Sequence, residues 1–216
     1  MTAFPKVTSF GMNGPFKAMT MDSAGPNMGY TIFYPDQLAP NGAKNPIVVW
    51  MSGGGTNPAL YPLLPLLATH GFVVVASNTV PGIGEEVNLG KEMVAGIDWA
   101  LAENGRDGSV FSGKLDATKI AATGYSMGSL ATFTIASDPR LTTTVHISGG
   151  NQQAERVKNL RNPAAFICGN PSGAGADIAA ANCDRDFKNA TTPVFYANFK
   201  GGHLGIRQEP TATQIS

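Results

Sequence analysis

The pentapeptide Gly124-Tyr125-Ser126-Met127-Gly128 combines a nucleophile with the glycines that a sharp backbone reversal needs. It follows the apolar run 119–123, which predicts a strand, and precedes the small-residue stretch 127–137, which predicts a helix. A G-x-S-x-G in that context is typical of a nucleophile elbow, in which a strained serine stands exposed at the carboxyl edge of a sheet. The positive end of the helix dipole favours negative charge there. We therefore predict that Ser126 is a nucleophile; the alternative is an ordinary tight turn.

A serine hydroxyl needs a general base to take its proton, and the chain offers three histidines. His203 lies in a glycine-rich loop just past the last predicted strand, where a base can reach the sheet edge. His70 precedes Gly71 at a predicted helix end, which favours a solvated cap residue. His146 lies inside the predicted strand 144–148, which favours a packed core histidine. We predict His203 as the base, with a flexible loop histidine as the alternative.

The base in turn needs a carboxylate that fixes its tautomer. The acidic residues between the serine and the histidine are Asp138, Glu155, Asp177, Asp184 and Asp186. Asp177 follows the predicted strand 164–168, at a carboxyl edge beside the histidine loop, and is the predicted acid. Asp184 is the second candidate, although Asp184 and Asp186 fall in a predicted helix, where a solvated face is expected. Asp138 ends the elbow helix and Glu155 precedes the strand that should deliver the acid, so both are set aside.

Acyl transfer also needs hydrogen-bond donors for the oxyanion. The backbone N–H of Met127, the residue after the nucleophile, is the first predicted donor. The second should come from Ser52-Gly53-Gly54-Gly55-Thr56, where glycines let N–H groups turn inward. We predict Gly55 as that donor, with Gly54 next, and expect Gly54 and Tyr125 beside the substrate; core packing is the alternative for Tyr125. Glycine loops also cradle phosphates, but the chain has no G-x-x-x-x-G-K-[ST] motif.

Two cysteines, Cys168 and Cys183, flank the predicted acid. A disulfide between them would close a 15-residue loop, stabilise the fold by about 3 kcal/mol and fix the acid's loop. Such a bond indicates a secreted or periplasmic protein. The alternative is two buried free thiols in a reducing cytosol. The scattered histidines and the cysteine spacing fit no zinc site, so no metal and no cofactor are expected.

The elements that must position these residues alternate between strands and helices, which predicts a mostly parallel sheet of about six to eight strands. Strands are predicted at 30–34, 46–50, 72–76, 119–123, 144–148, 164–168 and 193–199. Helices are predicted at 58–70, 86–103, 127–137 and 178–190. In open α/β sheets, functional residues gather beyond the carboxyl ends of the strands.

Length and composition fit one domain over residues 1–216. The chain has 43% hydrophobic residues and equal numbers, 15 each, of basic and acidic residues. Zero net charge and the lack of basic runs give no support for nucleic-acid or membrane-surface partners. No transmembrane stretch and no signal peptide are recognisable, although a mature exported chain would look the same. We expect a monomer, with association as the alternative.

From about residue 30 to residue 205 the chain resembles the cutinase-like polyester hydrolases, which include polyethylene terephthalate hydrolases, and related lidless esterases. The stretch 67–75 (LATHGFVVV) and the GYSMG pentapeptide carry the resemblance, with the Gly-Gly-His ending as a weaker match. The resemblance implies an α/β-hydrolase fold without a cap domain. It also implies a triad of Ser126, an acid near Asp177 and His203, with Gly55 and Met127 at the oxyanion.

Three departures from that family stand out. Gly55 occupies a position where those polyesterases have an aromatic side chain, and Ser148-Gly149-Gly150-Asn151 replaces a region that carries a tryptophan. The aromatic clamp for terephthalate rings is therefore expected to be missing. The chain also ends 13 residues after His203, so the usual C-terminal helix is expected to be short or absent.

Together these features predict a serine carboxylic-ester hydrolase acting on short-chain or polymeric esters. Only 15 residues separate Ser148 from Ala164, too few for a helical cap, so an open site is expected. The alternatives are a non-catalytic binding module on the same fold, or a peptidase or acyltransferase. The presence of both Ser126 and His203 in fitting contexts argues against the binding module.

Overall fold

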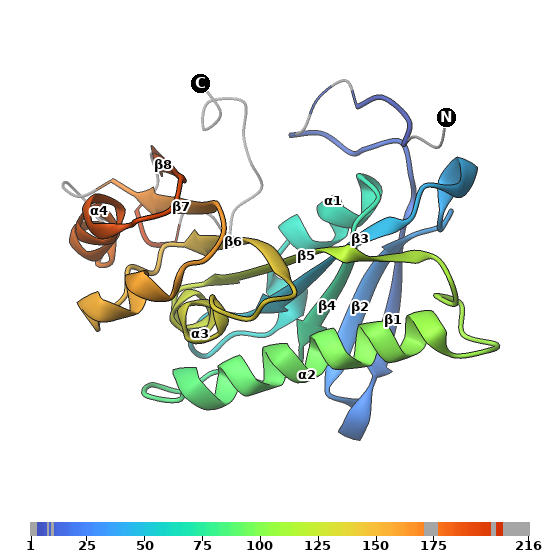
Figure 1. Ribbon diagram of the computed structural model, residues 1–216, viewed down its shortest axis with the longest axis horizontal. Helices are drawn as coiled ribbons and strands as arrows, with labels where there is room; N and C mark the ends of the chain where they lie inside the picture. The colour runs from blue at the N-terminus through green and yellow to red at the C-terminus, as the bar shows by residue number, and fades with distance from the viewer. Residues whose placement is uncertain (1–3, 8, 10, 171–176, 200–201, 205–216) are drawn as a thin grey trace.

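A twisted eight-stranded sheet forms the centre of the molecule in the computed structural model (Figure 1). The structure describes residues 4–7, 9, 11–170, 177–199 and 202–204. The strands are β1 (Ala18–Ala24), β2 (Tyr30–Pro35), β3 (Asn45–Met51), β4 (Val73–Ser77), β5 (Leu115–Tyr125), β6 (Leu141–Ile147), β7 (Ala164–Gly169) and β8 (Val194–Phe199). Their spatial order is β1-β2-β4-β3-β5-β6-β7-β8. The pairs β1–β2 and β2–β4 are antiparallel and the other neighbours are parallel, so the mostly parallel sheet predicted from the sequence is confirmed.

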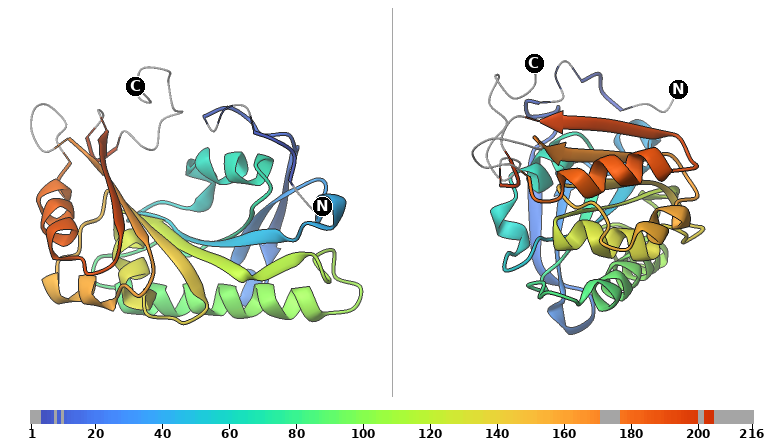
Figure 2. Two further views of the ribbon diagram at one scale, coloured as in Figure 1. Left: turned by 45° about the horizontal axis from the view of Figure 1, so that its top comes forward. Right: turned by 90° about the vertical axis from the view of Figure 1, so that its left-hand side faces the viewer.

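Helices cover both faces of this sheet (Figure 1). The α-helices are α1 (Leu63–Thr69), α2 (Glu86–Gly105), α3 (Met127–Ile135) and α4 (Ala180–Asn189). The short 3-10 segments are η1 (Pro26–Met28), η2 (Pro40–Gly42), η3 (Pro58–Leu60) and η4 (Ala154–Asn159). Helices α2 and α3 lie on one face and α1 lies on the other, while α4 packs beside β7 near one end of the sheet (Figure 2). This architecture confirms the α/β-hydrolase fold class expected from the sequence.

Alternation along the central strands explains why both faces need cover. In β3, Ile47 and Val49 pack toward α2, whereas Val48 and Trp50 pack toward α1. All four side chains are at most 5% exposed, as expected for a parallel strand with helices on both faces. The two apolar layers hold the carboxyl ends of β5, β6 and β7 at one edge of the sheet.

The structure departs from the expected elements in two places. The helix predicted over 58–70 is divided into η3 and α1, because the prolines at 58, 62 and 65 remove amide donors near its start. Gly71 follows α1 with φ of +95°, the backbone conformation expected for a C-cap glycine. Strand β1 was not predicted, since its sequence AMTMDSA has no apolar run longer than two residues and only Ala24 is buried. The expected short end of the chain after His203 falls in residues 205–216, outside the described residues.

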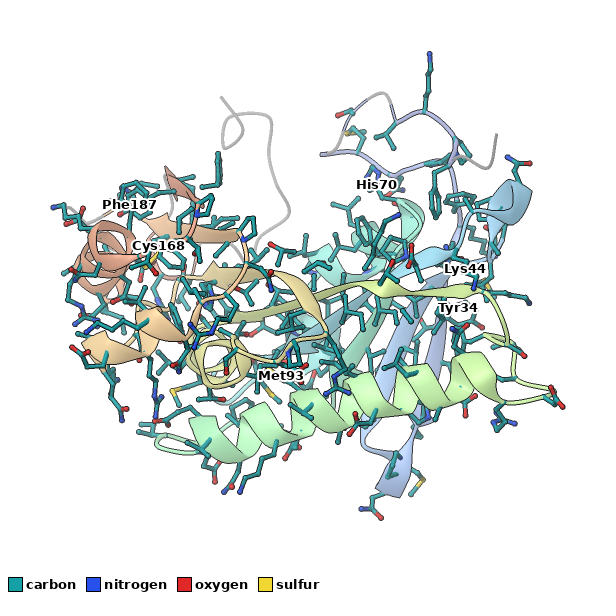
Figure 3. All side chains as sticks on the ribbon, viewed as in Figure 1. Tyr34, Lys44, His70, Met93, Cys168 and Phe187 are labelled. Atoms are coloured by element: carbon teal, nitrogen blue, oxygen red, sulfur yellow. A yellow bond between two sulfur atoms is a disulfide. The ribbon has the colours of Figure 1, made fainter. Side chains whose placement is uncertain are left out.

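The disulfide expected between Cys168 and Cys183 is confirmed, with the two Cα atoms 6.6 Å apart. It joins the end of β7 to α4, and Figure 3 labels Cys168 beside that helix. Both sulfur-bearing side chains are buried together with Ala179. The bond therefore holds together the two segments that border the loop before Asp177.

Removing this bond should lower the free energy of unfolding by about 3 kcal/mol, because the unfolded chain regains the freedom of a 15-residue loop. The change is the double variant Cys168→Ala/Cys183→Ala, measured by urea denaturation against the oxidised wild type. Dithiothreitol should destabilise the wild type and leave the double variant unaffected. Equal midpoints for the oxidised wild type and the variant would contradict the prediction.

Candidate active site

Ser126 lies on the tight connection between β5 and α3, in a backbone conformation that is unfavourable for an L-residue. Its φ is 53° and its ψ is −113°, and its N–H donates to the carbonyl of Ile147 at 2.9 Å. A Cβ on Gly124 would lie 2.3 Å from the carbonyl carbon of Gly128, and one on Gly128 would lie 2.0 Å from the carbonyl oxygen of Met51. Because these contacts are with backbone, neither glycine can be replaced without moving the main chain. The geometry is that of a nucleophile elbow, as the pentapeptide predicts.

The structure brings Ser126, His203 and Asp177 into one chain of hydrogen bonds, although they come from three separate connections. Nε2 of His203 lies 3.0 Å from Oγ of Ser126, and Nδ1 of His203 lies 2.7 Å from Oδ1 of Asp177. Since an ionised carboxylate only accepts, Nδ1–H donates to Asp177 and Nε2 is left to accept the serine proton. Such an arrangement allows a serine hydroxyl to attack while it transfers its proton to the imidazole.

The carboxylate of Asp177 is fully enclosed by donors. Backbone N–H groups of Gly169 and Ala179 donate to it at 2.7 and 2.9 Å, and His203 supplies the third hydrogen bond. Burial by itself raises the pKa of this carboxyl, but the three hydrogen bonds, that from His203 above all, outweigh burial and lower the pKa to about 2. Asp177 therefore stays ionised across the physiological range and holds the imidazole in one tautomer.

This low pKa predicts a loss of stability in acid. A carboxyl whose pKa is about 2 in the folded chain and 3.8 in the unfolded chain stabilises the fold above pH 4, by about 2 kcal/mol. That contribution should disappear as the pH falls from about 4 to about 2. The measurement is the difference in free energy of unfolding between the wild type and Asp177→Asn at pH 5, 4, 3 and 2. A difference that does not shrink over this interval would contradict the assignment.

The other two histidines occupy structural positions. His146 is 1% exposed, stacks on Phe133 at a centroid distance of 3.7 Å and is hydrogen-bonded to Thr144. Burial lowers the pKa of His146 to about 3, so its ring stays neutral in the core. His70 forms the C-cap of α1 and its Nε2 contacts the carbonyl oxygen of Met12 at 2.9 Å. Figure 3 labels His70 beside the N-terminal segment.

Of the remaining acidic candidates, Asp184 is solvated as expected and pairs with Lys188 at 2.7 Å, four residues along α4. The expectation that Asp186 also lies on a solvated face is wrong, because its side chain is buried (0% exposed). It accepts hydrogen bonds from the backbone N–H of Asn151 and from the guanidinium of Arg185, 2.8 Å away. Burial raises the pKa of Asp186, opposed by these bonds. The hydrogen bond between Asn151 and Asp186 joins the loop after β6 to α4. Helical periodicity does not encode such a tertiary contact.

The remaining two acidic candidates are each engaged in an ion pair. Asp138 forms a salt bridge with Arg140 just beyond α3, and the hydrogen bonds from this guanidinium lower the pKa of Asp138. Glu155 pairs with Lys158 within η4. Within the described residues neither carboxylate is hydrogen-bonded to His203, so the structure brings only Asp177 of the five candidates to the histidine.

The glycine loop after β3 lies against the start of α3. The N–H of Gly55 donates to the carbonyl of Pro81 at 3.0 Å, so this predicted donor is already engaged. The N–H of Gly53 donates to the hydroxyl of Tyr61 at 2.8 Å. Gly54 makes no hydrogen bond to any described residue, and a Cβ on it would lie 3.4 Å from Cγ of Met127. The geometry therefore favours Gly54 over Gly55 as the partner of the Met127 N–H.

Tyr125 lies in the core below the site, which is the packing alternative. Its side chain is 2% exposed, its ring contacts Tyr61, and its hydroxyl donates to the carbonyl of His203 at 2.6 Å. The two tyrosines thus support the histidine loop and the glycine loop. The hydrogen bond from Tyr125 to His203 has no local sequence signal, because it joins segments 78 residues apart that only the folded sheet brings together.

A cavity of about 320 Å³ opens beside the nucleophile, and Ser126 and His203 line it. Apolar lining comes from Ile83, Met127, Leu130 and Ile178. Ile83 and Ile178 are 95% and 84% exposed, which indicates an open entrance. Within the described ranges, no group of three or more His, Cys, Asp or Glu side chains is arranged to hold a metal ion. The same residues include no helix long and apolar enough to cross a membrane.

Comparison with known proteins identifies related chains. A family model described as PET hydrolase-like matches residues 5–193, which include Ser126 and Asp177; His203 lies beyond them. Cutinases est2 and est1 of Thermobifida alba are each 29% identical over 109 residues, which is 50% of this chain and 34% and 35% of theirs. Cutinase 1 of Thermobifida cellulosilytica is 26% identical over 109 residues, 50% of this chain and 39% of its own. The matched segment thus spans little more than a third of the length of these curated relatives.

Proposed function

Because the chain belongs to the PET hydrolase-like family, we propose that it is a serine carboxylic-ester hydrolase with Ser126, His203 and Asp177 as its triad. The observation that carries this proposal is the hydrogen-bond chain from the Ser126 hydroxyl through both nitrogens of His203 to the Asp177 carboxylate. The cutinase names of the relatives support ester substrates. The strained backbone at Ser126 supports a catalytic role, because such strain is concentrated at functional sites.

In the proposed mechanism, Oγ of Ser126 attacks the ester carbonyl carbon while Nε2 of His203 takes the hydroxyl proton. The carbonyl oxygen becomes an oxyanion, which accepts hydrogen bonds from the N–H groups of Met127 and Gly54. The tetrahedral intermediate collapses as the imidazolium gives its proton to the departing alcohol. Water, activated by the same histidine, then hydrolyses the acyl-enzyme and releases the acid. Asp177 stays ionised and stabilises the imidazolium.

The site geometry supports short-chain or polymeric esters as substrates. The connection from β6 to β7 contains only η4 and adds no cap over Ser126 within the described residues. Gly150 lies in the segment where the related polyesterases carry a tryptophan, and here α4 covers it. A Cβ on Gly150 would lie 2.3 Å from the amide nitrogen of Cys183. Any larger residue at position 150 would displace the helix. This supports aliphatic rather than aromatic acyl groups.

The Cys168–Cys183 disulfide supports a secreted or periplasmic location, since such bonds persist in oxidising compartments.

The test is a panel of p-nitrophenyl esters from acetate to palmitate, with p-nitroanilide peptides alongside. We expect turnover of the short esters, decline with acyl length in this open cavity, and no cleavage of the anilides. Cleavage of anilides alone would indicate a peptidase. A purified, folded chain inert toward every ester would contradict the proposal and favour a binding module.

A further inference from the structure

The cavity beside Ser126 has a polar side as well as an apolar one. Three polar residues line it in addition to the apolar isoleucines at its entrance: Ser148, Gln152 and Asn182. Ser148 is fully buried, and its hydroxyl has no hydrogen-bond partner in the described structure. Polar groups in such a wall weaken the binding of purely hydrocarbon chains unless the ligand satisfies them.

Packing against Gly150 and a hydrogen bond from Arg185 fix the position of Asn182 in this wall. Asn182 is the third residue of α4 and packs against Gly150, where a Cβ on the glycine would be 2.4 Å from Cβ of Asn182. Nη1 of Arg185 donates to Oδ1 of Asn182 at 3.3 Å, and the same guanidinium is held by the buried Asp186. The side-chain oxygen is thereby engaged. Asn182 lines the cavity, and its amide NH₂ group has no hydrogen bond to a described residue, so a bound substrate can be its acceptor.

The charge of the lining restricts what this donor can select. No Lys, Arg, Asp or Glu is among the described lining residues. A free carboxylate on a substrate would therefore lose hydration without gaining a cation. A neutral hydroxyl or carbonyl oxygen would gain a hydrogen bond from Asn182 at no such cost. The wall thus matches a neutral oxygen rather than an anion.

We propose that Asn182 is a specificity-determining residue, which makes the enzyme prefer esters that carry a neutral hydroxyl or carbonyl oxygen a few bonds from the scissile carbonyl. This inference rests on the proposed esterase function. The oxygen can belong to the acyl group, as in hydroxyacyl esters, or to the alcohol, as in glycol esters.

The experiment compares kcat/KM for methyl butyrate, methyl 3-hydroxybutyrate, 2-hydroxyethyl butyrate and monomethyl succinate, each divided by its rate of hydroxide hydrolysis. In the wild type, at least one hydroxylated ester should exceed methyl butyrate by about five- to tenfold, and the anionic succinate should not. The two hydroxylated esters show which part of the substrate reaches Asn182. Equal values for methyl butyrate and both hydroxylated esters would overturn the inference without any variant.

Asn182→Leu keeps the side-chain shape and removes the donor, so it should abolish the preference while methyl butyrate is still hydrolysed. Asn182→Ala serves if the leucine variant does not fold. Asn189→Leu, on an exposed position at the end of α4, is the matched control and should keep the preference. A preference that survives both changes at position 182 would overturn the inference. Failure of the wild type to hydrolyse methyl butyrate at all would instead contradict the proposed function, and this inference with it.

Discussion

Replacing Ser126 with alanine should lower kcat for short p-nitrophenyl esters by about 10⁶-fold, the loss seen when the serine of an unrelated triad is removed. The reason is that Oγ is the attacking atom, and no described hydroxyl other than Ser126 is hydrogen-bonded to Nε2 of His203. Residual turnover would come from the oxyanion donors and substrate binding alone. The measurement is kcat on p-nitrophenyl acetate, with enzyme concentrations high enough to detect the residual activity.

The matched control is Ser137→Ala, an exposed serine just past the other end of α3. It should retain wild-type kcat, and both variants should show wild-type urea midpoints. Substantial activity in Ser126→Ala, beyond the trace expected from contaminating wild type, would show that another residue attacks the ester.

Replacing Asp177 with asparagine should lower kcat by about 10⁴-fold. Asparagine offers an NH₂ group where His203 now finds an acceptor, so the ring would favour the tautomer that carries its proton on Nε2. That nitrogen could then no longer accept the proton of Ser126, 3.0 Å away. The imidazolium formed during attack would also lose its counter-charge.

Asp184→Asn is the matched control, because Asp184 was the second candidate for the acid and lies exposed in an ion pair with Lys188. It should keep kcat within about twofold of the wild type, since surface ion pairs contribute little. A large loss in Asp184→Asn with little loss in Asp177→Asn would reverse the assignment.

The sequence predicts the parts of the site that depend on local pattern. A strand, a serine between glycines and a helix follow one another along the chain, so the elbow at Ser126 can be predicted without tertiary information. The β-branched runs of β3 and β4 likewise predict buried strands. His203 and Asp177 follow from the rule that functional residues lie past strand ends.

Features that depend on contacts between distant segments could not be predicted in this way. Both Gly54 and Gly55 suit an inward-turned loop, and only tertiary contacts distinguish them: Gly55 is hydrogen-bonded to Pro81, whereas Gly54 lies against Met127. The burial of Asp186 depends on a partner 35 residues earlier, Asn151. Tyr125 supports His203 across 78 residues of sequence. In each case a polar group is satisfied by a tertiary partner, which hydrophobic periodicity does not report.

The most direct test of the proposed mechanism is covalent labelling with diethyl p-nitrophenyl phosphate, which phosphorylates a serine only when a neighbouring base activates it. Peptide mapping by mass spectrometry should find one diethylphosphoryl group, on Ser126, with loss of esterase activity in the same proportion. The label should be absent from Ser126→Ala and much slower to form in His203→Ala. A label on a different residue, or ester hydrolysis that continues at full rate after Ser126 is fully labelled, would contradict the account.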